Sequence, residues 1–177
     1  MIDAELSRSL LEAWYLDLPP AWVTACSLHT GQRIREPSLT AARVKPADLA
    51  DREFTGPVAS IEKFLAAGQE AQAYDGRPDT AVFSPLRRGH VACYDGAQYL
   101  FRALLRKLSP GPLPAKPVVL IRTPEGASQV EKIALADAAM QAGARRVLLY
   151  REPLEALLES AREQKALRRA LVLHIEP

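Results

Sequence analysis

The strongest constraint on this chain is an alternation, in its second half, of short apolar runs with amphipathic stretches. The runs at 118–121, 147–150 and 170–175 are apolar without alternation, which is typical of strands covered on both faces. Between them, 128–142 and 154–167 carry apolar residues at helical spacing. This order predicts parallel strands joined by right-handed crossovers, and therefore an α/β fold.

The ends of these two helices are also marked in the sequence. Ser128 followed by Glu131 resembles a capping box, and Gly143 is placed to end the first helix. Pro153 suits the first turn of the second helix, where its missing N–H has no partner to lose.

The first half of the chain predicts strands of a different kind. Apolar stretches at 14–18, 21–28 and 38–44 follow one another over short links, which favours an antiparallel meander. A stripe over 97–108 predicts a helix lying on the core. The predicted fold class is α/β, with a mixed sheet in which an N-terminal antiparallel meander precedes helix-linked parallel strands.

At 177 residues, the chain is expected to form one domain over 1–177. The pattern fades over 45–79, which we expect to be an irregular insert apart from a short helix near 64–74. The segment 109–117 is rich in proline and predicts a connector, because proline withholds a backbone donor.

Charge and cysteine usage exclude several function classes. Lys and Arg number 23 and Asp and Glu 21, and a net charge of +2 is too small to attract nucleic acid. Cys26 and Cys93 form no CxxC pair, so we expect reduced thiols and no metal site. No apolar run approaches the roughly 20 residues that span a bilayer, and 1–13 lacks the features of a secretory leader. We therefore expect a cytoplasmic protein without direct membrane insertion.

Three groups of segments resemble one family. The first is Asp17-Leu18 with 35–38, at the spacing of an opening β-hairpin. The second comprises 67–71, 76–78 and 84–95, and the third, which is the most specific, comprises 124–131, 142–147 and 151–154. Together they resemble the MreB family of bacterial actin homologues, the rod shape-determining proteins, over about 15–175.

The resemblance implies an actin and RNase-H-like ATPase fold, in which two lobes close on a nucleotide, and the chain ends where the first lobe ends. The family's first phosphate loop reads D-L-G-T, whereas this chain reads Asp17-Leu18-Pro19-Pro20. The two prolines remove amide donors and forbid the positive φ that glycine adopts. The family's second loop, D-I-G-G-G, corresponds to the last residues from His174 onward, where the chain reads H-I-E-P.

Two acidic positions of the family persist. By resemblance, Asp17 matches the carboxylate beside magnesium, and Glu152 matches the one that orients the attacking water. Carboxylates without phosphate amides do not clamp a nucleotide, so both are expected to be vestigial, with no enzyme activity and no cofactor. The alternative is residual binding of ATP and magnesium at Asp17, Leu18, Pro19, Pro20 and Glu152. The residues themselves favour Asp17 as a turn former and Glu152 as a neighbour of a helix cap.

Three residues are candidate partner contacts. An exposed Trp22 would anchor an interface, and Arg87 with Arg88 would contact an acidic partner; a core role for Trp22 and a solvated role for the arginines are the alternatives.

The resemblance and the altered loops support two hypotheses. The first is a degenerate MreB-like protein without ATPase activity, which acts through contacts with a cytoskeletal filament or cell-envelope complex in bacterial cell shape. The second is a nucleotide-binding actin-like ATPase lobe that works with a separate second lobe or as a filament subunit. A homo-oligomer that buries Trp22 and the sheet edge is a further alternative.

Overall fold

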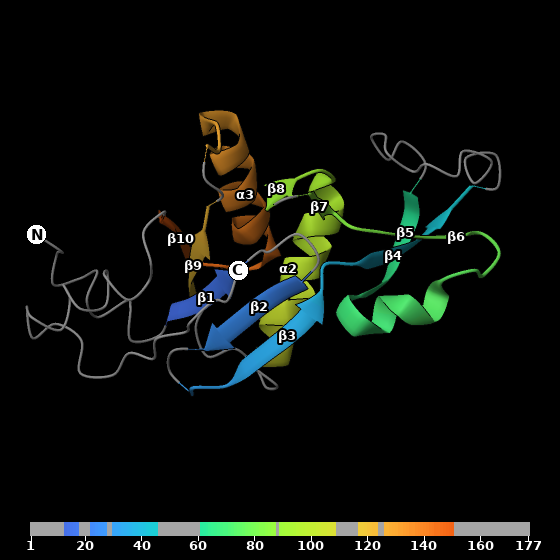
Figure 1. Ribbon diagram of the computed structural model, residues 1–177, viewed down its shortest axis with the longest axis horizontal. Coiled ribbons are helices and arrows are strands. Elements are labelled where there is room, and N and C mark those ends of the chain that lie inside the picture. Colours follow the sequence, from blue (N-terminus) through green and yellow to red (C-terminus); the bar gives the residue numbers. More distant parts are fainter. Residues whose placement is uncertain are drawn as a thin grey trace, which may run out of the picture.

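The computed structural model describes residues 13–17, 22–27, 30–45, 61–87, 89–108, 117–123 and 126–150. Its main body is a five-stranded sheet in the order β10-β9-β1-β2-β3 (Figure 1). The strands are β1 (Ala13–Asp17), β2 (Trp22–Ser27), β3 (Arg33–Pro37), β9 (Val118–Arg122) and β10 (Arg146–Tyr150). The first three pair antiparallel, whereas β9 is parallel to both β1 and β10. The predicted mixed sheet is confirmed.

The third strand of the meander was predicted in the wrong place. We expected it at 38–44, but the strand that pairs with β2 is β3, and β4 (Thr40–Val44) leaves for a second sheet. The sequence Arg-Ile-Arg-Glu-Pro is mostly polar, because β3 is an edge strand with only one covered face. A turn closed by the Leu39 N–H, which donates to the Pro37 carbonyl at 2.8 Å, separates β3 from β4.

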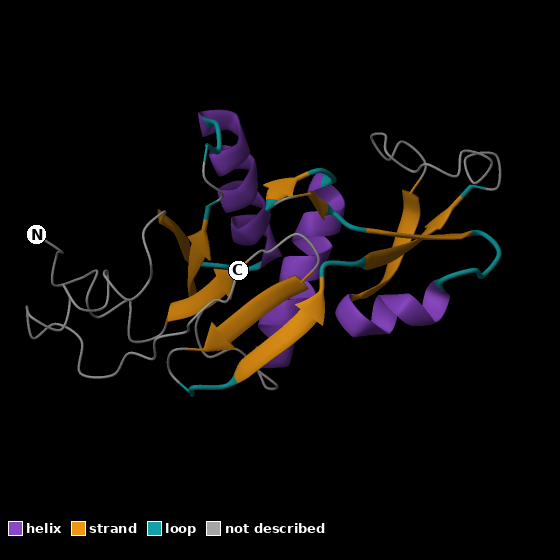
Figure 2. Ribbon diagram, viewed as in Figure 1, coloured by secondary structure: helices purple, strands orange, loops and turns teal. Residues whose placement is uncertain are grey.

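A small unit includes the described residues 61–74 of the stretch that was expected to be irregular. Strands β4, β5 (Ile61–Ala67) and β6 (Thr80–Phe83) form a sheet in the order β5-β4-β6, and the 3₁₀ helix η2 (Gly68–Tyr74) follows β5 (Figure 2). The short helix predicted near 64–74 therefore begins later, and 64–67 belong to a strand. Two register shifts between β4 and β5 interrupt the alternation of apolar residues. This explains why the sequence pattern did not predict β5.

Two helices cover one face of the main sheet. They are α2 (Tyr94–Leu108) and α3 (Gln129–Ala142), as predicted at 97–108 and 128–142. Phe101 and Leu100 of α2 are fully buried in one cluster with Val119 and Ile121 of β9. Burial of such a side chain contributes about 1.5–3 kcal/mol, so this contact holds the helices on the sheet. A short hairpin of β7 (Leu86–Arg87) and β8 (His90–Val91) precedes α2.

The predicted signals at the ends of α3 are confirmed. The Ser128 hydroxyl accepts from the Glu131 N–H at 3.3 Å, and the Glu131 carboxylate accepts from the Ser128 N–H at 2.7 Å. Gly143 ends the helix at φ 125°, a value that favours glycine. The predicted helix at 154–167, the strand at 170–175 and most of the connector at 109–117 lie outside the described residues, and the extent of the domain stays a prediction.

Replacement of Gly68 by alanine should destabilise the protein more than replacement of Gly76. Both glycines have φ near +70°, so alanine costs about 1 kcal/mol at either position. Only at Gly68 would the added Cβ lie 2.3 Å from Glu36 Oε2, whereas nothing lies within 4 Å of a Cβ at Gly76. Displacing Glu36 breaks charged hydrogen bonds worth about 1.5–3 kcal/mol. Urea unfolding of Gly68→Ala and Gly76→Ala measures the difference, and equal losses would contradict this packing.

Candidate functional site

The carboxyl ends of three parallel strands lie along one edge of the main sheet. Leu16 of β1 is opposite Ile121 of β9, and Tyr150 of β10 is opposite Arg122. The last residues of these strands, Asp17, Arg122 and Tyr150, therefore stand in a row. Ligands of α/β sheets bind beyond such carboxyl ends, so this edge is the candidate site.

Thr123 ties two of these strand ends together. Its N–H donates to the Tyr150 carbonyl at 2.9 Å, and its hydroxyl donates to the same carbonyl at 3.1 Å. Thr123 itself is buried, and Tyr150 is half-buried. Sequence reasoning missed Thr123, although a hydroxyl residue two positions after the apolar run 118–121 was a usable signal. The consequence is a fixed spacing between the ends of β9 and β10.

The structure places some of the predicted site residues at this edge. Asp17 ends β1 and is opposite Thr24 of β2, so the link between β1 and β2 leaves from the same edge. Leu18, Pro19 and Pro20 belong to that link and lie outside the described residues. Glu152 follows the end of β10 by two positions and also lies outside them, so its role stays a prediction.

The N-terminus of α3 already has a carboxylate of its own. Both Ser128 groups, the N–H and the hydroxyl, donate to Glu131 Oε2 at 2.7 Å. These hydrogen bonds, led by that of the hydroxyl, hold the pKa of Glu131 below its ordinary value, and the nearby His90 acts in the same direction. His90 Nδ1 lies 3.1 Å from Glu131 Oε1. This helix end is therefore occupied by a side-chain anion, which disfavours a phosphate there.

Trp22 lies at the same edge of the sheet, at the start of β2. It is 38% exposed, and the Arg35 guanidinium lies 5.0 Å from its ring centroid. Val23 and Ile34 pack toward the core that α2 covers, so Trp22 and Arg35 lie on the other face of the sheet. An exposed aromatic ring beneath a guanidinium fits the proposed partner contact better than a core role.

The other candidate partner contact lies on the hairpin before α2. Arg87 is exposed on β7, opposite His90 of β8, and His90 in turn contacts α3 through Glu131. Arg88 lies outside the described residues.

Helix α3 carries an exposed apolar row that sequence reasoning missed. Val130 is 76% exposed, Ile133 60% and Met140 41%. The buried residues of the same helix, Leu135 and Ala138 among them, lie on its inner face. The row was hidden in the sequence because α3 is rich in alanine and carries apolar residues on more than one face. A row of this kind is a candidate protein contact.

The part of the chain that the structure describes offers little for metal or thiol chemistry. No group of three or more potential metal ligands occurs there, and none of its helices is long and apolar enough to cross a membrane. Burial raises the pKa of both the Cys26 and the Cys93 thiols, which disfavours a reactive thiolate.

The mixed sheet, its strand order and the helices on one face define an actin-like fold, and comparisons with known proteins agree. The family model described as MreB/Mbl protein matches residues 16–175, and the chain belongs to that family. It is 30% identical to the cell shape-determining protein MreB of Haemophilus influenzae over 104 residues, which are 57% of this chain and 30% of the relative. It is 31% identical to the cell shape-determining protein Mbl of Bacillus subtilis over 103 residues, 57% of this chain and 31% of that relative. The matched part is therefore about a third of the length of these curated relatives.

Solved structures show the same relationship. MreB5 of Spiroplasma citri, crystallised with ADP, superposes with a TM-score of 0.60 and 26% identity, covering 82% of this chain and 40% of that one. A subunit of the MamK double helical filament superposes with a TM-score of 0.57 over 80% of this chain and 42% of its own. At 19% identity, the MamK likeness supports the fold alone.

Glu131 should make the stability of the protein depend on pH in the acid range. In the folded state the pKa of Glu131 is lowered from its ordinary value of 4.5. Glu131 therefore contributes to the stability of the fold above pH 4.5, and this contribution is lost as the pH falls through the folded-state pKa. Glu131→Gln should therefore flatten the loss of stability below pH 4.5, measured by urea unfolding on either side of that pH. Glu62→Gln, at an exposed residue of β5, is the control and should leave the loss unchanged. A wild-type-like acid loss in Glu131→Gln would contradict this assignment.

Proposed function

We propose that this chain is an actin-like component of the bacterial cell-shape cytoskeleton that acts through protein contacts and does not hydrolyse ATP. Its relatives from Haemophilus influenzae and Bacillus subtilis are cell shape-determining proteins. The family membership supports the process, and the chemistry of one loop supports the absence of hydrolysis.

The observation that carries the proposal is the link between β1 and β2. In the sequence, Pro19 and Pro20 stand two and three positions after Asp17. Asp17 is the last residue of β1, and β1 ends at the edge where the parallel strands end. A phosphate cradle needs backbone N–H groups that point at the anion, and often a positive φ. Proline supplies neither, since its nitrogen carries no hydrogen and its φ is fixed near −65°. The two residues that follow Leu18 therefore offer a phosphate no backbone N–H donors.

Protein contact is supported by exposed side chains in two places. Trp22 with Arg35 lies at the edge of the main sheet, and the Val130, Ile133 and Met140 row lies on α3. Apolar side chains that are exposed to water cost more free energy than charged ones, and burying them against a partner recovers that cost. The partners we propose are a filament of related subunits, a cell-envelope protein or a second copy of this chain, and not nucleic acid.

The second candidate function is a nucleotide-binding lobe that works with a separate second lobe or as a filament subunit. One observation favours it: Asp17 and the end of β10, two positions before Glu152, lie at the same sheet edge. The structures of Spiroplasma citri MreB5 with ADP and with AMPPNP show that relatives of this fold hold nucleotides.

A thermal melt with Mg-ATP separates the two functions. We expect no rise in Tm for the wild type or for Asp17→Ala in millimolar nucleotide, because the loop lacks phosphate donors. A bound ligand at about a hundred times its Kd would add about 2.7 kcal/mol, which is a rise of roughly 5–10 °C for a chain of this size. A rise of that size that Asp17→Ala abolishes would establish the second function instead. The reverted loop Pro19→Gly with Pro20→Thr tests whether donors alone restore binding.

The apolar row on α3 should contribute to assembly. We expect the wild type to self-associate with rising concentration in sedimentation velocity, and the double variant Val130→Ser, Ile133→Ser to do so much more weakly. Both residues are exposed, so the stability should change by no more than about 0.5 kcal/mol. Gln129→Ser, at an exposed polar residue of the same helix, is the matched control. Unchanged association in the double variant would remove α3 from the contact.

A further inference from the structure

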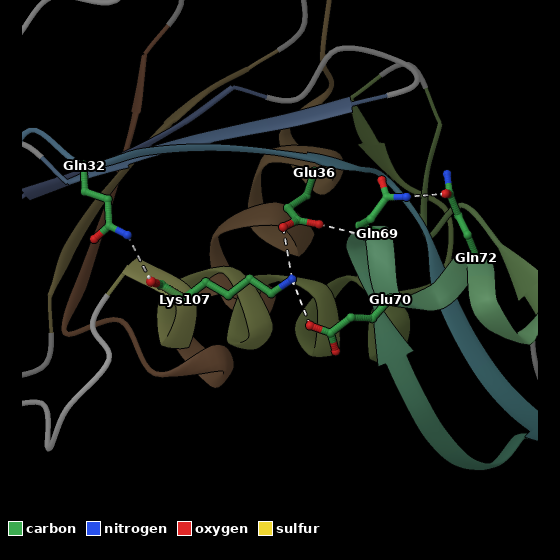
Figure 3. A network of polar contacts seen from close by, with 6 residues as sticks. All are labelled: Gln32, Glu36, Gln69, Glu70, Gln72 and Lys107. Carbon is green, nitrogen blue, oxygen red and sulfur yellow. Dashed lines mark hydrogen bonds and ion pairs between the residues drawn. The ribbon is translucent and has the colours of Figure 1, made fainter.

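The junction between the main body and the small unit, defined here as β4, β5, β6 and η2, has an aromatic half and a polar half. In the aromatic half, the Phe64 ring of β5 stacks on the Tyr99 ring of α2, with centroids 5.1 Å apart and planes at 21°. In the polar half, Lys107 at the end of α2 reaches toward both units (Figure 3).

One ammonium group is shared between two carboxylates that belong to different units. Lys107 Nζ lies 3.0 Å from Oε1 of Glu36 on β3, and 3.2 Å from Oε1 of Glu70 on η2. The second oxygen of Glu36 accepts from the Gln69 N–H of η2 at 2.7 Å. Glu36 and Lys107 belong to the main body, whereas Glu70 and Gln69 belong to the small unit. The ion pair of Lys107 with Glu70 and the hydrogen bond from Gln69 to Glu36 therefore cross the junction.

The two arms of this network differ in their exposure to water. The Glu36 side chain is 13% exposed, Lys107 is 31% exposed, and Glu70 is 69% exposed. Salt screens an exposed pair strongly and a covered pair weakly. The arm to Glu70 is therefore the one that ionic conditions can weaken.

Lys107 keeps its charge throughout the neutral range. Burial by itself would lower the pKa of Lys107, but the hydrogen bonds to Glu36 and Glu70 outweigh it and raise the pKa above its ordinary value. The network therefore responds to salt and to competing charges, and not to pH near neutrality.

The small unit has little apolar material of its own to hold it in place. Its own buried cluster consists of Ala41, Ala66 and Ala71, with larger apolar side chains partly buried around it. Val44 of β4 is buried outside that cluster. Units with few buried apolar contacts open locally at low cost in free energy. Contacts across the junction must therefore supply much of the free energy that keeps the small unit in place.

From these contacts we propose that Lys107 is a salt-sensitive latch that holds the small unit on the main body, and that its release opens the small unit without unfolding the main sheet. Ions that screen the Glu70 arm, or an anionic group that competes for Lys107, shift the population toward the open state. The Phe64 and Tyr99 stack is unaffected by salt and limits how far the unit opens.

Hydrogen exchange of the full chain, followed by mass spectrometry, tests the latch. In Lys107→Met we expect amides of 61–74 to exchange about tenfold faster. The variant loses the ion pair with Glu70 across the junction, and Glu36, which accepts from the Gln69 N–H, loses its charged partner. Amides of β2 and β9 should keep their wild-type rates. Arg106→Met removes the same charge from the neighbouring exposed position of α2 and should leave 61–74 unchanged.

Salt and a second variant provide the other arms of the test. Between about 0.05 M and about 0.5 M NaCl, the wild type should exchange faster in 61–74 by about two- to fivefold, the range of an exposed ion pair. Glu70→Gln should show that faster rate already at low salt and lose most of the salt dependence. Three results would overturn the latch. They are equal changes in the exchange of 61–74 in Arg106→Met and Lys107→Met, faster exchange throughout the main sheet in Lys107→Met, or no change of exchange in 61–74 in Lys107→Met.

Discussion

The pairing of β1 on both of its sides determines the arrangement of the rest of the described structure. It pairs antiparallel with β2 and parallel with β9, so this one strand joins the antiparallel strands β2 and β3 to the parallel strands β9 and β10. This double pairing brings Asp17, the start of β2 at Trp22 and the ends of β9 and β10 to one edge of the sheet. The buried apolar side chains of α2 and β9 hold that arrangement in place. A change of register at β1 would displace every residue of the candidate site.

The sheet edge and the loop sequence that follows β1 point to different conclusions about function. The edge is of the kind at which α/β sheets bind ligands. The chain belongs to the MreB/Mbl family by its match over 16–175. The loop residues Pro19 and Pro20, in contrast, supply none of the donors that a phosphate needs. A fold does not by itself imply a function, so we assign the function from the loop and from the exposed contacts on β2 and α3. The latch that we propose at Lys107 would give such a protein a way to change shape without nucleotide.

Sequence patterns predicted the parts of this structure in which local signals and burial agree. The runs that became β9 and β10, the stripe of α2 and the capping box of α3 were all placed correctly. Continuous apolar runs, helical stripes and capping boxes are strong local patterns. Strand β3 was missed because it contains few apolar residues: Arg33 and Arg35 are exposed on one face, and Glu36 lies on the other, where it contacts Lys107. Strand β5 was missed because register shifts break its alternation with β4 and the cluster it joins is built of alanine. Contacts such as Lys107 with Glu36 join residues far apart in the chain, and no local pattern carries them.

The most direct test of the central claim is the release of phosphate from Mg-ATP by the purified chain at concentrations that favour assembly. Wild type, Glu152→Gln and a blank without protein should give the same rate, because the loop after Asp17 provides no phosphate donors. Release that scales with the concentration of the wild type, and that falls in Glu152→Gln, would contradict the claim and make this chain a working ATPase lobe.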